Sequence, residues 1–183
     1  INRFNTVTYL ANLYGIGLKY LDQTVEGKTF GDFVTLKFTI TIYNNKQNQY
    51  ALQGQSENLN SIITLLNMNN HKVLLTGDAE DTKQFNEIAK KVGDIDVLKV
   101  PHHGSRNCAL LTKWYAKKIH NTQVDGTTEY KSTALSDLKA EYYIVTSSAN
   151  KIKTIRDKYS VGNSNMCVDP VFSYISNQKL SSK

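Results

Sequence analysis

The feature that most constrains the fold is an apolar pattern between residues 72 and 101 that changes from strand to helix and back to strand. Residues 72–76 and 95–100 are short apolar runs, and the second is stopped by a proline. Between them, the apolar positions follow the spacing i, i+3, i+4 and i+7, which indicates one buried face of a helix made by Phe85, Ile88, Ala89 and Val92. Because a crossover helix returns the chain in the same direction, the pattern predicts a β-α-β unit with two parallel strands.

Other elements follow from the same kind of pattern. Strict alternation predicts a half-buried strand over residues 35–42, and the apolar runs 61–66 and 72–76 predict a hairpin that turns at residues 67–70. The remaining expectations are a helix ending near Tyr14, a surface loop at 44–60, a helix carrying Leu110, Leu111, Trp114, Lys118 and Ile119, a polar insertion at 121–132, a strand at 142–146, a helix at 152–159 and a strand at 171–175.

Length and composition allow one domain. The 183 residues, 40% of them hydrophobic, can bury a single core, and the start at Ile1 suggests a fragment of something longer. No run approaches the roughly 18 apolar residues of a spanning helix, so we expect no membrane segment. Cys108 and Cys167 form no Cys-x-x-Cys pair and are expected to be free thiols, and the net charge of +6 favours phosphate-rich partners.

The predicted parallel strands bring two chemically useful residues together. Asp78 and His103 follow the ends of these strands, and parallel strands place such ends at one edge of the sheet, where open α/β sheets bind ligands. A carboxylate and a neutral imidazole are ligands for zinc, manganese or iron. The plainer alternatives remain: an aspartate after a strand is commonly a turn or cap residue, and most histidines bind no metal. Glu80 and Asp81 are expected to be surface or capping residues.

Two motifs carry a resemblance to a known family. Leu74-Leu75-Thr76-Gly77-Asp78, followed by Asp96-Val97-Leu98-Lys99-Val100-Pro101-His102-His103-Gly104-Ser105, is similar to the paired motifs of ComEC-like metallo-β-lactamase domains, and Asn60-Ser61 looks like that family's Asn-Ser element. The resemblance covers roughly residues 27–146. It implies an α/β fold, the αββα sandwich of the metallo-β-lactamases, of which residues 1–183 supply about the C-terminal half as a single partial domain.

The resemblance also implies roles for individual residues. Asp78 becomes the carboxylate ligand and His103 the late histidine ligand of a divalent metal, zinc in the first instance and manganese in the second. His102 is a weaker ligand candidate, and orienting a ligand, binding a phosphate oxygen and simple packing stay open for it. Gly104 lets the backbone approach the metal or substrate, and Ser105 either bonds nearby or caps the next helix. Asn60 and Ser61 complete the residues expected around the site.

The chain departs from the family in two places. Its four histidines, His71, His102, His103 and His120, contain no His-x-His-x-Asp-His run, the main ligand cluster of the N-terminal half. A catalytic zinc needs about three protein ligands, and Asp78 with His103 supplies two. The family's His-Pro element after the strand 142–146 is replaced by Ser147-Ser148-Ala149-Asn150-Lys151. Three explanations remain open: the first half lies on a separate chain, it was lost or is not included in this sequence, or the lineage has dropped catalysis and kept the scaffold.

Two functions follow as expectations. The first is part of a metal-dependent hydrolase, a phosphodiesterase or nuclease in which a metal-bound hydroxide attacks phosphorus, with nucleic acid as substrate. The second is a catalytically inactive metallo-β-lactamase-like structural or interaction module in a larger assembly. Both require a partner, the missing half or another polypeptide, to cover the exposed sheet. The chain has no Gly-x-Ser-x-Gly elbow and no phosphate-binding Gly-rich loop, which argues against serine hydrolases and P-loop enzymes.

Overall fold

A computed structural model gives the fold. It describes residues 13, 27–32, 34, 37–43, 57–119, 123–147, 171, 174, 175, 177 and 178, and at 57, 114–119 and 123–128 it describes the backbone alone. These residues form eight strands: β1 (Thr29–Asp32), β2 (Phe38–Tyr43), β3 (Ile63–Met68), β4 (His71–Leu75), β5 (Val97–Lys99), β6 (Lys113–Ile119), β7 (Gln123–Tyr130) and β8 (Tyr142–Ile144). The helical elements are η3 (Glu57–Asn60), α2 (Thr82–Val92), η4 (Pro101–Gly104) and α3 (Ala134–Leu138).

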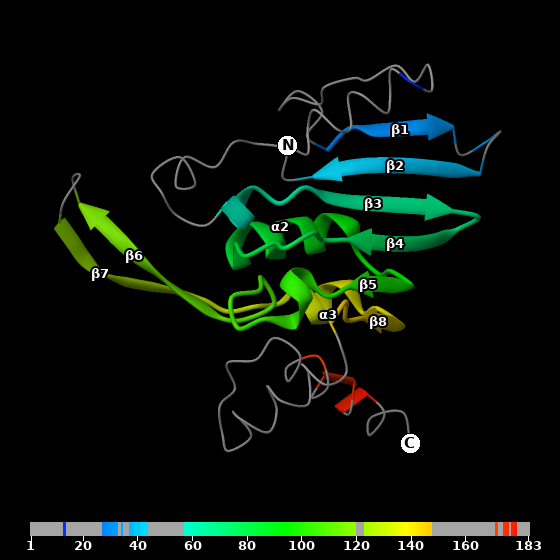
Figure 1. Ribbon diagram of the computed structural model, residues 1–183. Helices are drawn as coiled ribbons and strands as arrows, with labels where there is room; N and C mark the ends of the chain where they lie inside the picture. Colours follow the sequence, from blue (N-terminus) through cyan, green and yellow to red (C-terminus); the bar gives the residue numbers. More distant parts are fainter. Residues whose placement is uncertain are drawn as a thin grey trace.

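The strands form a mixed sheet of six, in the order β1-β2-β3-β4-β5-β8, and a separate hairpin of β6 and β7 that extends away from it (Figure 1). Strands β1 to β4 pair antiparallel, whereas β4, β5 and β8 are parallel to one another. The predicted α/β class and the parallel β-α-β unit are therefore confirmed.

The turn between β3 and β4 is shorter than the predicted four residues. Met68 pairs with His71, so only Asn69 and Asn70 form the turn, with φ of 50° and 69°. Two successive left-handed residues are typical of the type I′ turn, whose twist matches that of a hairpin, and asparagine tolerates this conformation better than most residues.

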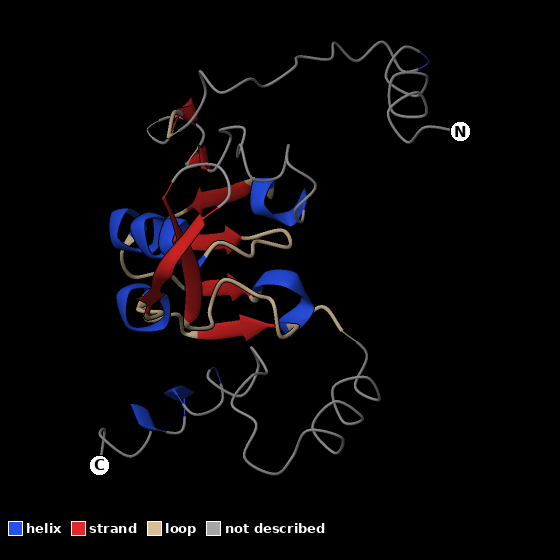
Figure 2. Cartoon of the chain, turned by 90° about the vertical axis from the view of Figure 1, so that its left-hand side faces the viewer, coloured by secondary structure: helices blue, strands red, loops and turns tan. Residues whose placement is uncertain are grey.

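Helices α2 and α3 cover one face of the six-stranded sheet (Figure 2). The predicted helix stripe is buried in the core, Asp81 caps the first turn by accepting a hydrogen bond from the Gln84 N–H at 3.1 Å, and Gly93 ends the helix with a φ of 66°. Opposite the helix, Ile63, Leu74 and Leu98 are almost fully buried.

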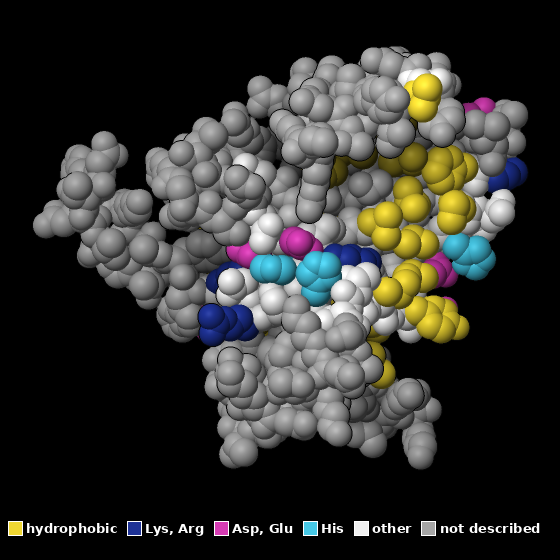
Figure 3. Space-filling view, viewed as in Figure 1, with side chains coloured by type: hydrophobic (Ala, Val, Ile, Leu, Met, Phe, Trp, Pro, Cys, Tyr) yellow, Lys and Arg dark blue, Asp and Glu magenta, His cyan; other side chains and the backbone are white. Residues whose placement is uncertain are grey.

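Among the described residues, the second face of the same sheet is apolar and partly open to solvent. One row of paired residues crosses all six strands: Phe30, Ile40, Leu66, Val73, Val97 and Tyr142. None of the six is fully buried, and Phe30 and Tyr142 are 40% and 60% exposed. Figure 3 shows hydrophobic side chains gathered over this face. Exposed apolar faces of this kind are typical of contact surfaces.

Several predicted elements are wrong. The expected helix after Ser105 is instead a buried loop followed by β6, and the expected polar insertion is β7, its antiparallel partner. Leu110 and Leu111, which suggested a helical stripe, are buried in the loop before the strand begins. Residues 171, 174 and 175 are helical, so the strand predicted at 171–175 is also wrong.

Other predictions agree in part or lie outside the described residues. The strand predicted at 35–42 is β2, and the strand predicted at 142–146 is β8. Leu13 is helical, as expected, but the rest of its segment, residues 44–56 of the predicted loop and the helix at 152–159 lie outside the described residues. Cys108 is buried in a disulfide, so the expectation of a free thiol is wrong there.

Candidate metal centre

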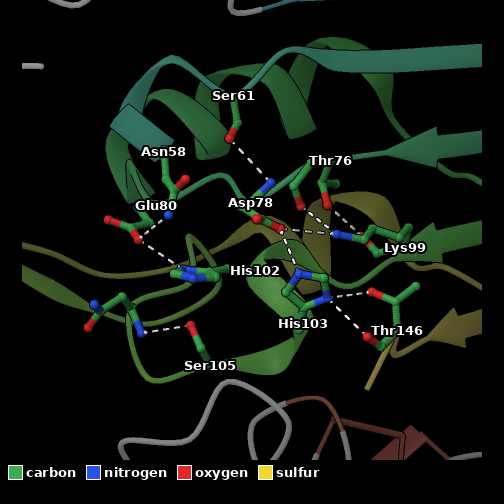
Figure 4. A network of polar contacts seen from close by, with 12 residues as sticks. Asn58, Ser61, Thr76, Asp78, Glu80, Lys99, His102, His103, Ser105 and Thr146 are labelled. Atoms are coloured by element: carbon green, nitrogen blue, oxygen red, sulfur yellow. Dashed lines mark hydrogen bonds and ion pairs between the residues drawn. The ribbon is translucent and has the colours of Figure 1, made fainter. Parts of the chain in front are cut away.

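The parallel strands β4 and β5 bring Asp78 and His103 together, as the topology predicted. The Nε2 atom of His103 lies 3.4 Å from Oδ1 of Asp78, and both side chains are partly open to solvent, at 48% and 37%. Figure 4 shows the two side chains facing one another beyond the strand ends. Their convergence is confirmed, whereas their role as ligands is still a prediction.

Backbone geometry explains why the Asp78 loop has this sequence. Gly77 has a φ of 53°, and a Cβ added to it would lie 3.3 Å from the Cβ of Ser61. A larger residue would therefore be strained by its conformation and crowded by its neighbour. The Asp78 N–H donates to the Ser61 hydroxyl at 3.2 Å, which fixes the loop against the start of β3. Asn60, the other residue of the predicted Asn-Ser element, ends η3 directly before Ser61.

A second contact determines how the His103 ring is presented. Its Nδ1 lies 3.0 Å from the carbonyl oxygen and 2.9 Å from the hydroxyl oxygen of Thr146. Because a carbonyl can only accept, Nδ1 must carry the proton that it shares with this group. In neutral imidazole Nε2 then carries a lone pair, and it faces the carboxylate of Asp78.

Two acceptor atoms so close together need a positive group between or beside them. A proton on Nε2 provides one solution, and a metal ion bound to both atoms provides another. In tetrahedral zinc coordination a nitrogen and an oxygen ligand lie about 3.4 Å apart, which the observed distance matches. Thr146 would orient the ring in the way that second partners orient metal-binding histidines. The two donor atoms therefore fit a divalent metal ion.

Lys99 places an ammonium group at the same carboxylate. Its ammonium lies 3.6 Å from Oδ1 of Asp78 and donates to the Gly77 carbonyl at 2.5 Å. The Lys99 side chain is only 15% exposed, so it approaches Asp78 from the protein side, whereas His103 approaches from the solvent side. The Thr76 hydroxyl donates to the Lys99 carbonyl at 2.7 Å and ties the ends of β4 and β5 together.

His102 faces away from this pair. Its Nδ1 lies 2.9 Å from Oε1 of Glu80, in an orientation outside hydrogen-bond geometry, so the contact is electrostatic when the ring is protonated. The same carboxylate oxygen accepts a hydrogen bond from the Asn58 side chain at 3.0 Å. Glu80 is only 7% exposed, and the cap of α2 is Asp81, so the expectation that Glu80 is a surface or capping residue is wrong.

The histidine loop has an unusual backbone. His102, His103 and Gly104 have φ of 48°, 53° and 75°, so three successive residues are left-handed. The His102 N–H donates to the Gly77 carbonyl at 3.2 Å, and the Ser105 N–H donates to the His102 carbonyl at 2.8 Å. The Ser105 hydroxyl accepts from the Asn107 N–H at 3.4 Å, so it bonds locally and caps no helix.

Lys113 links the loop that follows β4 to the loop that follows η4. Its ammonium donates to the carbonyls of Glu80 and Asn107, the latter at 2.6 Å. Burial lowers the pKa of Lys113, and the nearby carboxylates of Glu80 and Asp81 partly offset that shift. Because the amine joins the segment after β4 to the segment after η4, it helps to keep Asp78 and His103 at a constant separation.

Sequence reasoning missed Lys99, Thr146, Glu80, Asn58 and Lys113. Thr146 had a usable signal, since it follows a predicted strand as Asp78 and His103 do, and a third parallel strand would bring it to the same edge. Lys99 lies within the motif of residues 96–105, but alternation along a strand indicates only the face of the sheet on which a residue lies. Asn58 and Lys113 carried no pattern that distinguishes them from ordinary loop residues.

The ligand set is incomplete within the part of the chain that the structure describes. There, no three histidine, cysteine or carboxylate side chains lie close enough together to hold a metal ion.

No helix among the described residues has both the length and the apolar character needed to cross a bilayer.

Comparison with known proteins gives one short similarity. No family model matches the chain. Over 52 residues it is 44% identical to Recombination protein 2 of Haemophilus influenzae, and this stretch covers 28% of the chain and 6% of that protein. The chain therefore spans a small part of the length of the relative that it matches.

Proposed function

We propose that this chain is part of a metal-dependent hydrolase, a phosphodiesterase or nuclease, and that Asp78 and His103 are two of its metal ligands. A divalent ion, zinc or manganese, supplies a Lewis acid and lowers the pKa of the water that it binds. The observation that carries the proposal is the ring of His103, which Thr146 holds at Nδ1 so that Nε2 lies 3.4 Å from Asp78 Oδ1. Histidine ligands of metal ions are commonly oriented in this way.

The fold that we propose is the αββα sandwich of the metallo-β-lactamases, with the present sheet as its C-terminal half. The apolar row across six strands supports a second sheet as the covering layer, because sheets pack face to face through such surfaces. That second layer, on the missing N-terminal half or on another polypeptide, would bring the histidine and carboxylate ligands that this chain lacks. The proposed partner is therefore needed both for packing and for chemistry.

Nucleic acid is the substrate that we propose. The net charge of +6 favours association with phosphate-rich polymers. The Haemophilus protein that shares the 52-residue stretch is named for recombination, which agrees with a nucleic-acid substrate. Asp78 and His103 would hold the metal next to the scissile phosphate. His102, Gly104 and Ser105 lie on the same loop and would line the approach to it, with Asn60 and Ser61 on the other side.

A second candidate is a catalytically inactive module of the same fold. Lys99 favours it, because an ammonium 3.6 Å from Asp78 Oδ1 already provides a positive charge that a metal would otherwise provide. In that case the site is an internal salt bridge that stabilises the loops, and the open apolar face is the functional surface.

Metal content decides between the two. The chain would be purified from its natural source with every co-purifying polypeptide retained, and zinc and manganese would be measured by elemental analysis. We expect at least about one ion per complex, lost in Asp78→Ala and in His103→Ala, together with hydrolysis of a DNA oligonucleotide. His71→Ala is the matched control, since His71 lies 3.1 Å from Asp96 in a histidine–aspartate pair away from Asp78 and His103. Metal at background level in the wild type, with circular dichroism showing a folded protein, would leave the inactive module.

A further inference from the structure

We propose that Lys99 is a built-in competitor for the metal, and that a divalent ion binds Asp78 against the charge of the Lys99 ammonium. The inference rests on the proposed function, because it assumes that Asp78 is a ligand. It goes further than that function, because it assigns the control of metal affinity to Lys99, a residue that is not a ligand.

The first observation is that two groups converge on one oxygen atom. Both the Lys99 ammonium and the His103 ring approach Oδ1 of Asp78, at 3.6 Å and 3.4 Å. A metal ion that uses this oxygen shares it with the ammonium. Figure 4 shows the two groups on different sides of the carboxylate.

The second observation is that Lys99 cannot easily move away. Its ammonium is anchored by the Gly77 carbonyl at 2.5 Å, and its side chain is only 15% exposed. Its own backbone is held by the Thr76 hydroxyl at 2.7 Å. An exposed lysine would swing into solvent when a metal arrives, whereas this one stays beside the carboxylate and keeps its charge there.

The size of the effect has a lower bound. An ion bound to Oδ1 at about 2.1 Å lies within about 6 Å of the Lys99 nitrogen, because the two distances share that oxygen. Even with the dielectric constant of bulk water, repulsion between a divalent ion and an ammonium at that distance weakens binding roughly tenfold, and a partly buried site increases the factor. Without metal, the same ammonium neutralises Asp78 and keeps its loop in place.

This arrangement makes metal retention depend on the partner. Asp78 and His103 alone would hold a divalent ion weakly against Lys99, and the additional ligands of a completed site would overcome the repulsion. The isolated chain would thus be protected from acquiring metal before it is assembled.

The test compares Lys99→Met, which removes the charge and keeps the length, with Lys99→Arg, which keeps the charge. Each protein is purified with its co-purifying polypeptides, and Zn²⁺ affinity is measured by competition with a chelator at low ionic strength, where screening is weak. We expect Lys99→Met to bind Zn²⁺ roughly tenfold or more tightly than the wild type, and Lys99→Arg to stay within about threefold.

Thermal unfolding gives a second readout that does not depend on activity. Lys99→Met should melt at a lower temperature than the wild type without metal, and its Tm should rise more when Zn²⁺ is added. If Lys99→Met does not fold, Lys99→Gln, which can still donate to the Gly77 carbonyl, takes its place. Equal or weaker Zn²⁺ binding by the uncharged variants would overturn the inference and leave the proposed function intact. Absence of Zn²⁺ binding in the wild type and all variants would overturn both.

Discussion

The part of the chain that the structure describes contains two histidine–aspartate pairs, at opposite ends of the same two strands. His71 and Asp96 lie at the beginning of β4 and just before β5, and Asp78 and His103 lie beyond their ends. The two residues of each pair are 25 positions apart in the sequence. The closest nitrogen–oxygen distances are similar, 3.1 Å and 3.4 Å.

What surrounds the two pairs is different. Asp96 also accepts a hydrogen bond from the Lys72 N–H at 2.6 Å, so its carboxylate joins β4 to β5, and its histidine is 72% exposed. His103 is instead oriented by Thr146, and Asp78 is flanked by an anchored ammonium. The comparison teaches that a histidine near an aspartate does not define a metal site. The second contacts of the residues distinguish the two pairs: the His71–Asp96 pair links β4 to β5, whereas the Asp78–His103 pair is a candidate ligand pair.

The largest expected difference between the pairs is in metal binding. Asp78→Asn keeps the shape of the side chain and removes its charge, so Zn²⁺ affinity should fall by roughly a hundredfold or more. Asp96→Asn should leave the affinity unchanged, because that carboxylate lies at the other end of the strands. Chelator competition on both variants measures the difference, and equal losses would show that the two pairs do not differ in function.

A smaller effect is expected at Thr146. Thr146→Val removes the hydroxyl that lies 2.9 Å from His103 Nδ1 and leaves the carbonyl contact at 3.0 Å. Orientation of the ring is weakened rather than lost, so metal affinity should fall roughly tenfold. Thr146→Ser keeps the hydroxyl and should bind metal as the wild type does. A Thr146→Val protein with full affinity would mean that the carbonyl alone orients the ring.

His102 should matter less than its neighbour. Its ring faces Glu80 rather than Asp78 and meets the His103 ring only edge-on, with the two ring centroids 6.4 Å apart. His102→Ala should therefore change Zn²⁺ affinity by less than about threefold. The same titration on His103→Ala provides the scale. A loss as large as that of His103→Ala would make His102 a ligand and would revise the orientation described above.

The smallest expected effect is the pH dependence of stability at Asp96. The backbone hydrogen bond from Lys72, followed by the contact with His71, lowers the pKa of Asp96 from its ordinary value of 3.8. A carboxyl group whose pKa is lower in the folded state contributes stability above the unfolded value and loses it as the pH falls through the folded one. Wild type should therefore be slightly more stable than Asp96→Asn at neutral pH, and the difference in Tm should disappear below the folded pKa. A difference that persists there would have another cause.

The sequence predicted the central part of the site because periodicity determines that part of the fold. A helix stripe between two apolar runs requires a crossover, and a crossover requires parallel strands, which placed Asp78 and His103 together. The contact with Thr146 depends on the order of strands in the sheet, where β8 lies beside β5, and local pattern does not contain that order.

The failures have a similar origin. Leu110 and Leu111 match the spacing of a helix that includes Trp114. The residues that follow instead form strand β6, which is stabilised by pairing with β7, a segment predicted to be a polar insertion. Glu80 was expected to be a surface or capping residue, but it is buried, and its carboxylate accepts a hydrogen bond from the Asn58 side chain. Strand pairing and burial of charge are decided by contacts between distant segments, which outweigh local preference.

The left-handed backbone at His102 and His103 has a consequence for how this loop can evolve. Each of these two residues adopts a conformation that costs about 1 kcal/mol more for a residue with a side chain than for glycine. Selection for stability alone would therefore favour glycine in place of the two histidines. A population that keeps imidazoles at both positions accepts a less stable protein, and the metal-binding or salt-bridge role of those rings is the advantage that can outweigh it.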